Sequence, residues 1–150
     1  MKEYSPIQKY DLLNSFMYVL VPLSFLTIII SILMFGGLFV NKAILILNLL
    51  ISAYLGYRIY KSSYHMKFSY DRKSFNLEKG KKKKIQGRWK DFDRVSYAYT
   101  GYNEFEIRLY KKKGKEYVPE TKIPATKLGL NASDFRFEVM NFIKDERYNF

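Results

Sequence analysis

Residues 12–60 (LLNSFMYVLVPLSFLTIIISILMFGGLFVNKAILILNLLISAYLGYRIY) carry only two charged side chains, Lys42 and Arg58. Read as one helix, residues 12–40 would be about 43 Å long at ~1.5 Å per residue, which exceeds the ~30 Å of a bilayer's hydrocarbon core. Gly36 and Gly37 give this run a place to break. The sequence therefore predicts a two-helix transmembrane hairpin over residues 16–60, with helices at 16–35 and 42–60.

A soluble helical hairpin is disfavoured because residues 25–35 (FLTIIISILMF) offer no polar face to water. The apolar run is much longer than the core of a signal peptide and no cleavage site follows it, so we expect a retained anchor. Basic side chains gather after the second helix, at Arg58, Lys61 and Lys67, whereas the turn holds only Lys42. The positive-inside rule therefore predicts a multi-pass protein of the cell membrane with both termini in the cytoplasm.

Small and hydroxyl side chains recur on one face of each predicted helix. Spacings of i, i+3, i+7 in the first helix and i, i+4 in the second place them on common faces. Such residues let membrane helices approach closely, and an amide hydrogen-bonds across the contact. We expect interhelical packing by Ser24, Thr27, Ser31, Asn48 and Ser52.

Outside the hairpin the chain is strongly basic. Residues 61–150 hold 22 of the 26 Lys and Arg residues and 12 of the 14 Asp and Glu residues, so they carry most of the formal net charge of +12. Residues 1–15 are polar with scattered apolar positions and are interpreted as an N-terminal interfacial segment. Cysteine is absent, which excludes disulfides and thiolate metal sites.

After residue 61 apolar residues alternate with a period of two, which is typical of β-strands. Turn residues separate candidate strands at 66–70, 75–77, 85–89, 95–99, 105–109 and 117–124. An amphipathic helix follows, with Asn131 or Ser133 as its cap and Phe135 and Val139 on its apolar face. Residues 62–150 are therefore predicted to form a domain of antiparallel strands closed by a C-terminal helix, and the whole chain is assigned to the α+β class.

Residues 87–95 (GRWKDFDRV) combine the end of a strand with a bend, and residues 123–127 (IPATK) precede the final helix. Both motifs resemble the bacterial pleckstrin-homology-like (PH-like) domains, in particular the YcxB-like group of small membrane proteins. The chain departs from the pattern at Ala125, where the family often has a basic residue. The resemblance covers nearly the full chain. It implies a cytoplasmic PH-like antiparallel β roll or barrel with a C-terminal α-helix behind a two-helix anchor, and it supplies no catalytic residues.

Nine lysines fall in two short runs that are predicted to be hairpin turns. They are Lys79, Lys81, Lys82, Lys83 and Lys84 in the first run, and Lys111, Lys112, Lys113 and Lys115 in the second. Each basic side chain near an anionic membrane contributes ~1 kcal/mol, so we expect these runs to contact anionic lipid or a partner. Solvated loops that protect sheet edges are the plainer alternative, and stereospecific phosphoinositide binding ranks behind both.

Catalysis finds little support in the sequence. His65 is the only histidine, so a transition-metal site is not expected. The pairs Glu104/Glu106 and Asp91/Asp93 are interpreted as exposed structural carboxylates, because acid–base work needs a cleft. Gly80 lacks the spacing of a phosphate-binding loop. We therefore expect no catalytic residues, no cofactor and no metal.

Nucleic acid is the runner-up ligand for the same lysines, since aromatic side chains interleaved with positive charge suit single strands. It is disfavoured because Phe68, Tyr70, Phe75, Trp89, Tyr97 and Tyr99 occupy alternating strand positions, where most are expected in the core. The favoured hypothesis is a non-enzymatic, membrane-anchored PH-like module that docks a protein partner, by strand addition, or anionic lipid of the inner leaflet. An immunity-type protein and an accessory subunit of a larger membrane complex are the alternatives, and self-association of the chain stays open.

Overall fold

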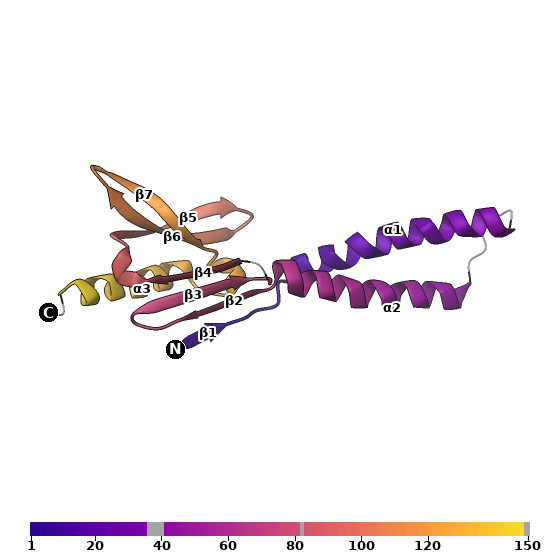
Figure 1. Cartoon of the computed structure of the whole chain (residues 1–150), viewed down its shortest axis with the longest axis horizontal. Helices are drawn as coiled ribbons and strands as arrows, with labels where there is room; N and C mark the ends of the chain where they lie inside the picture. The colour runs from indigo at the N-terminus through magenta and orange to yellow at the C-terminus, as the bar shows by residue number, and fades with distance from the viewer. Residues whose placement is uncertain (36–40, 82, 149–150) are drawn as a thin grey trace. The chain divides into compact units, whose positions relative to one another are not determined.

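The computed structural model describes residues 1–35, 41–81 and 83–148. The chain divides into two compact units. The helical unit comprises residues 7–65 and the turn 80–82, and the β unit comprises residues 1–6, 66–79 and the chain from residue 83 onward. Both appear in Figure 1. The α+β class predicted from the sequence is confirmed.

The helical unit contains two long helices, α1 (Lys9–Phe35) and α2 (Lys42–Ile59), and a short π-helix, η1 (Tyr60–Tyr64). By length and composition two segments could cross a membrane, Lys9–Met34 with 26 residues and Lys42–Tyr64 with 23. α2 begins where the sequence predicted, because the Asn41 side chain accepts a hydrogen bond from the Ala43 amide at 2.9 Å. α1 starts earlier than residue 16 and runs through Pro22, and Gly36 and Gly37 lie outside the described residues.

The two helices meet through polar and small side chains. Asn48 Nδ2 donates to Thr27 Oγ1 at 2.9 Å, and Thr27 Oγ1 donates to Leu23 O at 2.9 Å. Gly56 lies so close to α1 that an added Cβ would be 2.7 Å from Phe16 Cα. Ser15, Ser31, Asn48 and Ser52 are buried, and Ser24 is half-buried. The five residues predicted to lie between the helices are thus partly or fully shielded.

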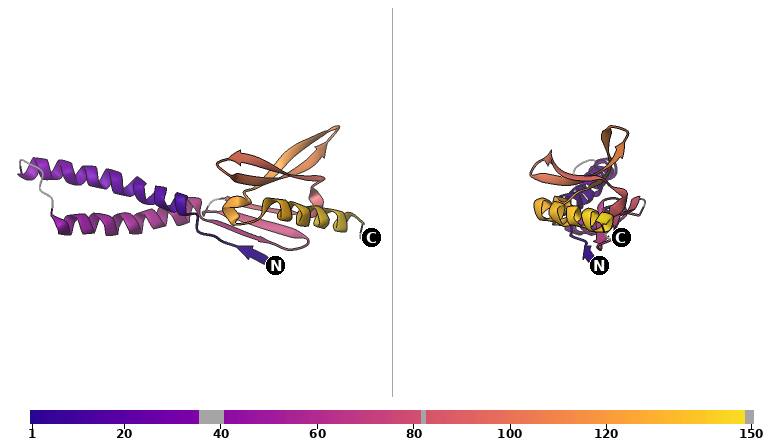
Figure 2. Two further views of the ribbon diagram at one scale, coloured as in Figure 1. Left: turned by 180° about the vertical axis from the view of Figure 1, so that it is seen from behind. Right: turned by 90° about the vertical axis from the view of Figure 1, so that its left-hand side faces the viewer.

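The β unit consists of two antiparallel sheets and a helix. One sheet has the order β1-β2-β3-β4 and the other β5-β6-β7. The strands are β1 (Lys2–Tyr4), β2 (Met66–Tyr70), β3 (Ser74–Lys79), β4 (Lys83–Arg88), β5 (Arg94–Gly101), β6 (Glu104–Lys113) and β7 (Glu116–Ile123). The C-terminal helix α3 (Ala132–Tyr148) lies along the opening between the two sheets (Figures 1 and 2). Asn131 caps it by accepting hydrogen bonds from the Ser133 and Asp134 amides.

A single aromatic-rich core joins both sheets to α3. Trp89, Phe68, Ile107 and Val139 are fully buried, and Phe135 of α3 meets the Phe68 ring edge-on at 5.6 Å between centroids. Trp89 belongs to a 3₁₀ turn (Trp89–Asp91) and does not continue β4 as the alternation predicted. The turn brings Phe92 into the core three residues later, where it is 4% exposed. Most of the six aromatics on alternating strand positions were expected in the core, and four are buried, namely Phe68, Tyr70, Phe75 and Trp89. Tyr97 and Tyr99 are exposed, because β5 extends past the core beyond Val95.

The N-terminal residues differ from the interfacial segment predicted for 1–15. β1 pairs with β2, with Lys2 opposite Tyr70 and Tyr4 opposite Phe68. Lys2 Nζ binds Glu138 Oε1 at 2.6 Å, and the Tyr70 hydroxyl donates to Glu138 Oε2 at 2.8 Å. Burial and the bond to Glu138 raise the pKa of Tyr70 above its ordinary value. Residues 1–6 therefore belong to the β unit, because β1 covers an edge of β2 that would otherwise be open.

Replacing Gly56 tests the contact between α1 and α2. Gly56→Ala places a methyl group against the backbone of α1, and such overpacking costs ~1–3 kcal/mol. We expect a lower melting temperature for the full chain in detergent micelles, followed by circular dichroism. Leu50→Ala is the control, because Leu50 is 63% exposed on the same helix. Equal melting temperatures for Gly56→Ala and the wild type would contradict the contact.

Candidate functional site

The β3–β4 turn is bound to η1 and to His65, the residue that follows it, by backbone hydrogen bonds. The Gly80 amide donates to His65 O at 2.7 Å, and the Lys81 amide donates to Ser62 O at 3.0 Å. Gly80 has φ +58°, and a Cβ added there would overlap Ser62 O and lie 3.0 Å from Ser63 Cα. Only glycine fits this position, since it alone combines the left-handed conformation with so small a volume. Within the first lysine run, Lys81 is therefore held at the end of the helical unit.

Four exposed cations share that end of the helical unit. Lys9 begins α1, Arg58 lies at the end of α2, Lys61 belongs to η1, and Lys81 is held beside Ser62. The antiparallel contacts between α1 and α2 place the start of one helix beside the end of the other, whereas Lys42 lies at the opposite end. The described residues thus show a strongly asymmetric distribution of positive charge along the hairpin.

The other lysines of the first run lie on strands. Lys79 ends β3 and pairs with Lys83 of β4, and Lys84 of β4 binds Glu78 at 3.4 Å. Lys82 lies outside the described residues. The turn predicted for the first lysine run, residues 79–84, is therefore shorter than expected, because strand pairing continues to the Lys79–Lys83 pair.

The second lysine run is engaged within its own sheet. Lys111, Lys112 and Lys113 belong to β6, and Lys115 follows in the turn. Lys111 binds Glu120 at 2.8 Å and Lys113 binds it at 3.6 Å. The hydrogen bond between Lys111 and Glu120 raises the pKa of Lys111 and lowers the pKa of Glu120. Although the two runs look equivalent in sequence, the second is partly neutralised by its neighbours.

The β unit holds a groove of about 470 Å³ whose walls come from both sheets. Apolar side chains form part of its lining, namely Met66, Leu77, Ile85 and Phe105. Its lysines are Lys79, Lys83, Lys122 and Lys127, of which sequence reasoning had singled out the first two as site residues. Lys122 and Lys127 are isolated in sequence and reach the groove only through folding. Lys127 binds Glu104 at 3.5 Å, whereas Lys79, Lys83 and Lys122 form no ion pair within the described part of the chain.

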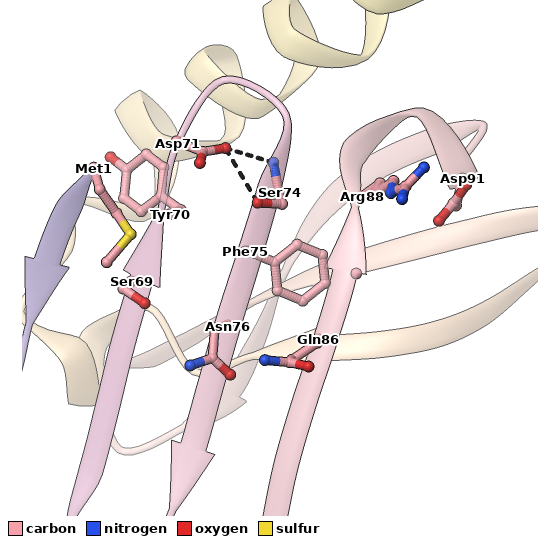
Figure 3. A pocket seen from close by; sticks show the side chains of 11 residues that line it. Met1, Ser69, Tyr70, Asp71, Ser74, Phe75, Asn76, Gln86, Arg88 and Asp91 are labelled. Atoms are coloured by element: carbon pink, nitrogen blue, oxygen red, sulfur yellow. Dashed lines mark hydrogen bonds between the residues drawn. The ribbon is translucent and has the colours of Figure 1, made fainter.

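A second depression in the β unit, of about 460 Å³, lies beside the Asp71 turn (Figure 3). Asp71 Oδ1 accepts hydrogen bonds from the Lys73 amide at 2.8 Å, the Ser74 amide at 2.7 Å and the Ser74 hydroxyl at 3.2 Å. Led by the Lys73 amide, these bonds lower the pKa of the Asp71 carboxyl below its ordinary value. The carboxylate thus shapes the turn and is not a candidate acid or base.

Asp93 and Glu106, which the sequence also offered as candidate carboxylates, are committed to structure. Asp93 Oδ2 accepts a hydrogen bond from the Lys112 amide at 2.7 Å, and Glu106 binds Arg108 at 2.7 Å. His65 lies beside the Tyr60 ring at 5.7 Å between centroids. Among the residues that the structure describes, no group of three His, Cys, Asp or Glu side chains is arranged to hold a metal ion.

Comparison of the chain with protein-family models, curated proteins and solved structures gave no match. The resemblance to the YcxB-like group therefore stays a prediction that rests on residues 87–95 and 123–127.

Replacing Gly80 tests whether the turn is held by η1. Gly114→Ala is a matched control, because Gly114 has a similar φ of +67° but open space where a Cβ would lie. We expect Gly80→Ala to accelerate hydrogen exchange at the amides of residues 80 and 81 in the full chain, since the methyl group forces the turn away from Ser62. The control should leave these amides unchanged. Equal exchange in Gly80→Ala and the wild type would contradict the contact.

Asp71 should stabilise the β unit in a pH-dependent way. Its pKa is lower in the folded chain, so its contribution is present above the ordinary carboxyl pKa and is lost as the pH falls through the folded value. We expect Asp71→Ala to lower the free energy of unfolding by about 1 kcal/mol at neutral pH and by progressively less in acid. The single tryptophan, buried Trp89, reports unfolding by fluorescence. Asp71→Asn, which keeps an acceptor oxygen, should lower the free energy of unfolding by less than Asp71→Ala does. A difference in the free energy of unfolding between wild type and Asp71→Ala that does not change with pH would contradict this role.

Proposed function

We propose that this chain is a non-enzymatic, membrane-anchored module in which the helical unit spans the bilayer and the β3–β4 turn contacts anionic headgroups. The observation that carries the proposal is the pair of hydrogen bonds from Gly80 and Lys81 to His65 and Ser62. They hold Lys81 at the same end of the helical unit as Arg58 and Lys61. Cations at the end of an apolar hairpin lie where anionic headgroups meet the hydrocarbon.

The side chains on the surface of the helical unit support the proposal that a bilayer surrounds it. Its buried side chains include Ser15, Asn48 and Ser52, whereas Leu33 is 79% exposed and Leu50 is 63% exposed. A hairpin in water would turn these leucines inward and its serines outward. Polar contacts between helices and aliphatic side chains on the outside are the arrangement that lipid favours.

The distribution of charge supports an orientation. Lys9, Arg58, Lys61 and Lys81 lie at one end of the hairpin and Lys42 at the other, so the positive-inside rule favours the first end on the cytoplasmic side. At ~1 kcal/mol per cation near an anionic surface, the four cations contribute at most about 4 kcal/mol, and salt reduces this contribution. Because the helices already confine the chain to the membrane, a smaller contribution is enough to orient the turn.

The β unit supports the PH-like assignment in its architecture. It combines antiparallel sheets of four and three strands with a C-terminal helix, as the resemblance implies. Ala125, where the family often has a basic residue, is fully buried against the core. A basic side chain at this position would enter the core, so the departure from the family pattern agrees with local packing in this chain.

Docking of a protein segment in the groove of the β unit is the second candidate function. β4 is an edge strand of its sheet, and the groove beside it has an apolar lining and three lysines, Lys79, Lys83 and Lys122, that lack ion pairs within the described part of the chain. An extended segment with acidic and apolar residues could add to this edge. An immunity-type protein and an accessory subunit of a larger membrane complex are separate alternative proposals.

Cysteine labelling tests the anchored arrangement, because the natural chain has no cysteine to interfere. In intact cells, we expect a membrane-impermeant maleimide to label Lys42→Cys from outside and to label Lys81→Cys only after permeabilisation. Both variants should stay with the membrane after alkaline extraction. Release by alkali would contradict the anchor, and labelling of both variants from the same side would contradict the hairpin topology.

A further inference from the structure

A crevice of about 330 Å³ lies on the helical unit at the end that carries Lys81. It is lined by Val19 of α1, by Leu55, Arg58 and Ile59 of α2, and by Ser62 and Lys81. Val19, Leu55 and Ile59 give it an apolar wall, while Arg58, Ser62 and Lys81 give it a polar side. The volume falls within the range of roughly 300–1,000 Å³ of pockets that hold small ligands.

The two cations of the crevice are positioned but not neutralised. The Arg58 guanidinium lies over the Tyr54 ring, 5.9 Å from its centroid, and the backbone of Lys81 is held by its bond to Ser62 O. Neither side chain forms an ion pair within the described part of the chain. Asp11 is the only acidic residue in the sequence of the helical unit. The crevice therefore offers two positive charges without a protein carboxylate to match them.

We infer that this crevice binds one anionic phospholipid, with the phosphate on Arg58 and Lys81 and the upper part of an acyl chain against Val19, Leu55 and Ile59. The inference rests on the proposed membrane anchor and deepens it from diffuse attraction to a discrete site. A guanidinium donates two parallel hydrogen bonds to a phosphate, and an ammonium adds a third charged donor. The Ser62 hydroxyl, which donates to Ile59 O at 3.1 Å, lies at the polar side.

The mixed lining favours a phospholipid over other anions. Inorganic phosphate would satisfy Arg58 and Lys81 but would leave the apolar wall uncovered. A neutral phospholipid would cover the wall, but its choline group would add positive charge beside two cations. An anionic phospholipid matches both sides of the crevice, since its charge and its hydrocarbon are joined within one molecule.

The site can be tested with the full chain purified in a non-ionic detergent and titrated with phosphatidylglycerol or phosphatidylcholine of identical acyl chains. Native mass spectrometry counts the lipids bound to each chain. We expect one phosphatidylglycerol to bind at concentrations at which phosphatidylcholine does not, and excess inorganic phosphate not to displace it. Equal binding of both lipids, or displacement by inorganic phosphate, would overturn the inference.

Variants separate a discrete site from general attraction. Arg58→Gln and Lys81→Gln should each weaken phosphatidylglycerol binding roughly tenfold or more, since each removes a charged hydrogen-bond donor to the phosphate. Lys61→Gln is the matched control, because Lys61 is an exposed cation at the same end that does not line the crevice. If Lys61→Gln weakens phosphatidylglycerol binding as much as Arg58→Gln and Lys81→Gln do, the inference of a discrete site is overturned. The proposed contact with anionic headgroups would not be contradicted by that result.

Filling the crevice provides a test that leaves every charge in place. Val19→Trp should occupy the apolar wall and weaken phosphatidylglycerol binding, while the far-ultraviolet circular dichroism of the chain stays that of the wild type. Unchanged binding in this folded variant would overturn the inference. Failure of the membrane anchor itself would appear separately, as release from membranes by alkali.

Discussion

The exposed aliphatic surface of α1 and α2 is the constraint on which the rest of the structure depends. The two helices face each other through Thr27, Asn48 and Gly56 and turn leucine and isoleucine side chains outward. Such a surface is unfavourable in water, because apolar area left exposed forfeits about 25 cal/mol per Å². An apolar environment removes this penalty. It also makes the internal Asn48–Thr27 hydrogen bond more important, because without this bond the Asn48 amide would be unsatisfied.

Much of the fold could be predicted from local patterns in the sequence. The start of the second helix at Lys42, the alternating strands and the Asn131 cap depend on neighbouring residues, and all are present. The features that were missed depend on residues far apart. β1 is only three residues long and pairs with a strand more than sixty positions away, and the burial of Trp89 in a 3₁₀ turn depends on the core around it.

The candidate site could be predicted in its composition but not in its geometry. Both lysine runs were visible as charge, yet Glu120 neutralises part of one while Ser62 and His65 hold the turn of the other. Arg58 was visible only as a cation at a helix end, and its place in a crevice with Val19 requires the crossing of α1 and α2. The sequence feature closest to the observed geometry was Gly80 within the first lysine run. Its left-handed backbone conformation and small volume let the turn lie against Ser62.

β1 and β2 are neighbouring strands of one sheet, although the whole helical hairpin separates them in the sequence. Ribosomes extend a chain by roughly 5–20 residues per second, so Lys2–Tyr4 must wait several seconds before Met66–Tyr70 has been made. During that interval the N-terminal strand has no ladder to join, while both apolar helices are already available for insertion. Pairing of β1 with β2 is therefore possible only after the anchor has been synthesised.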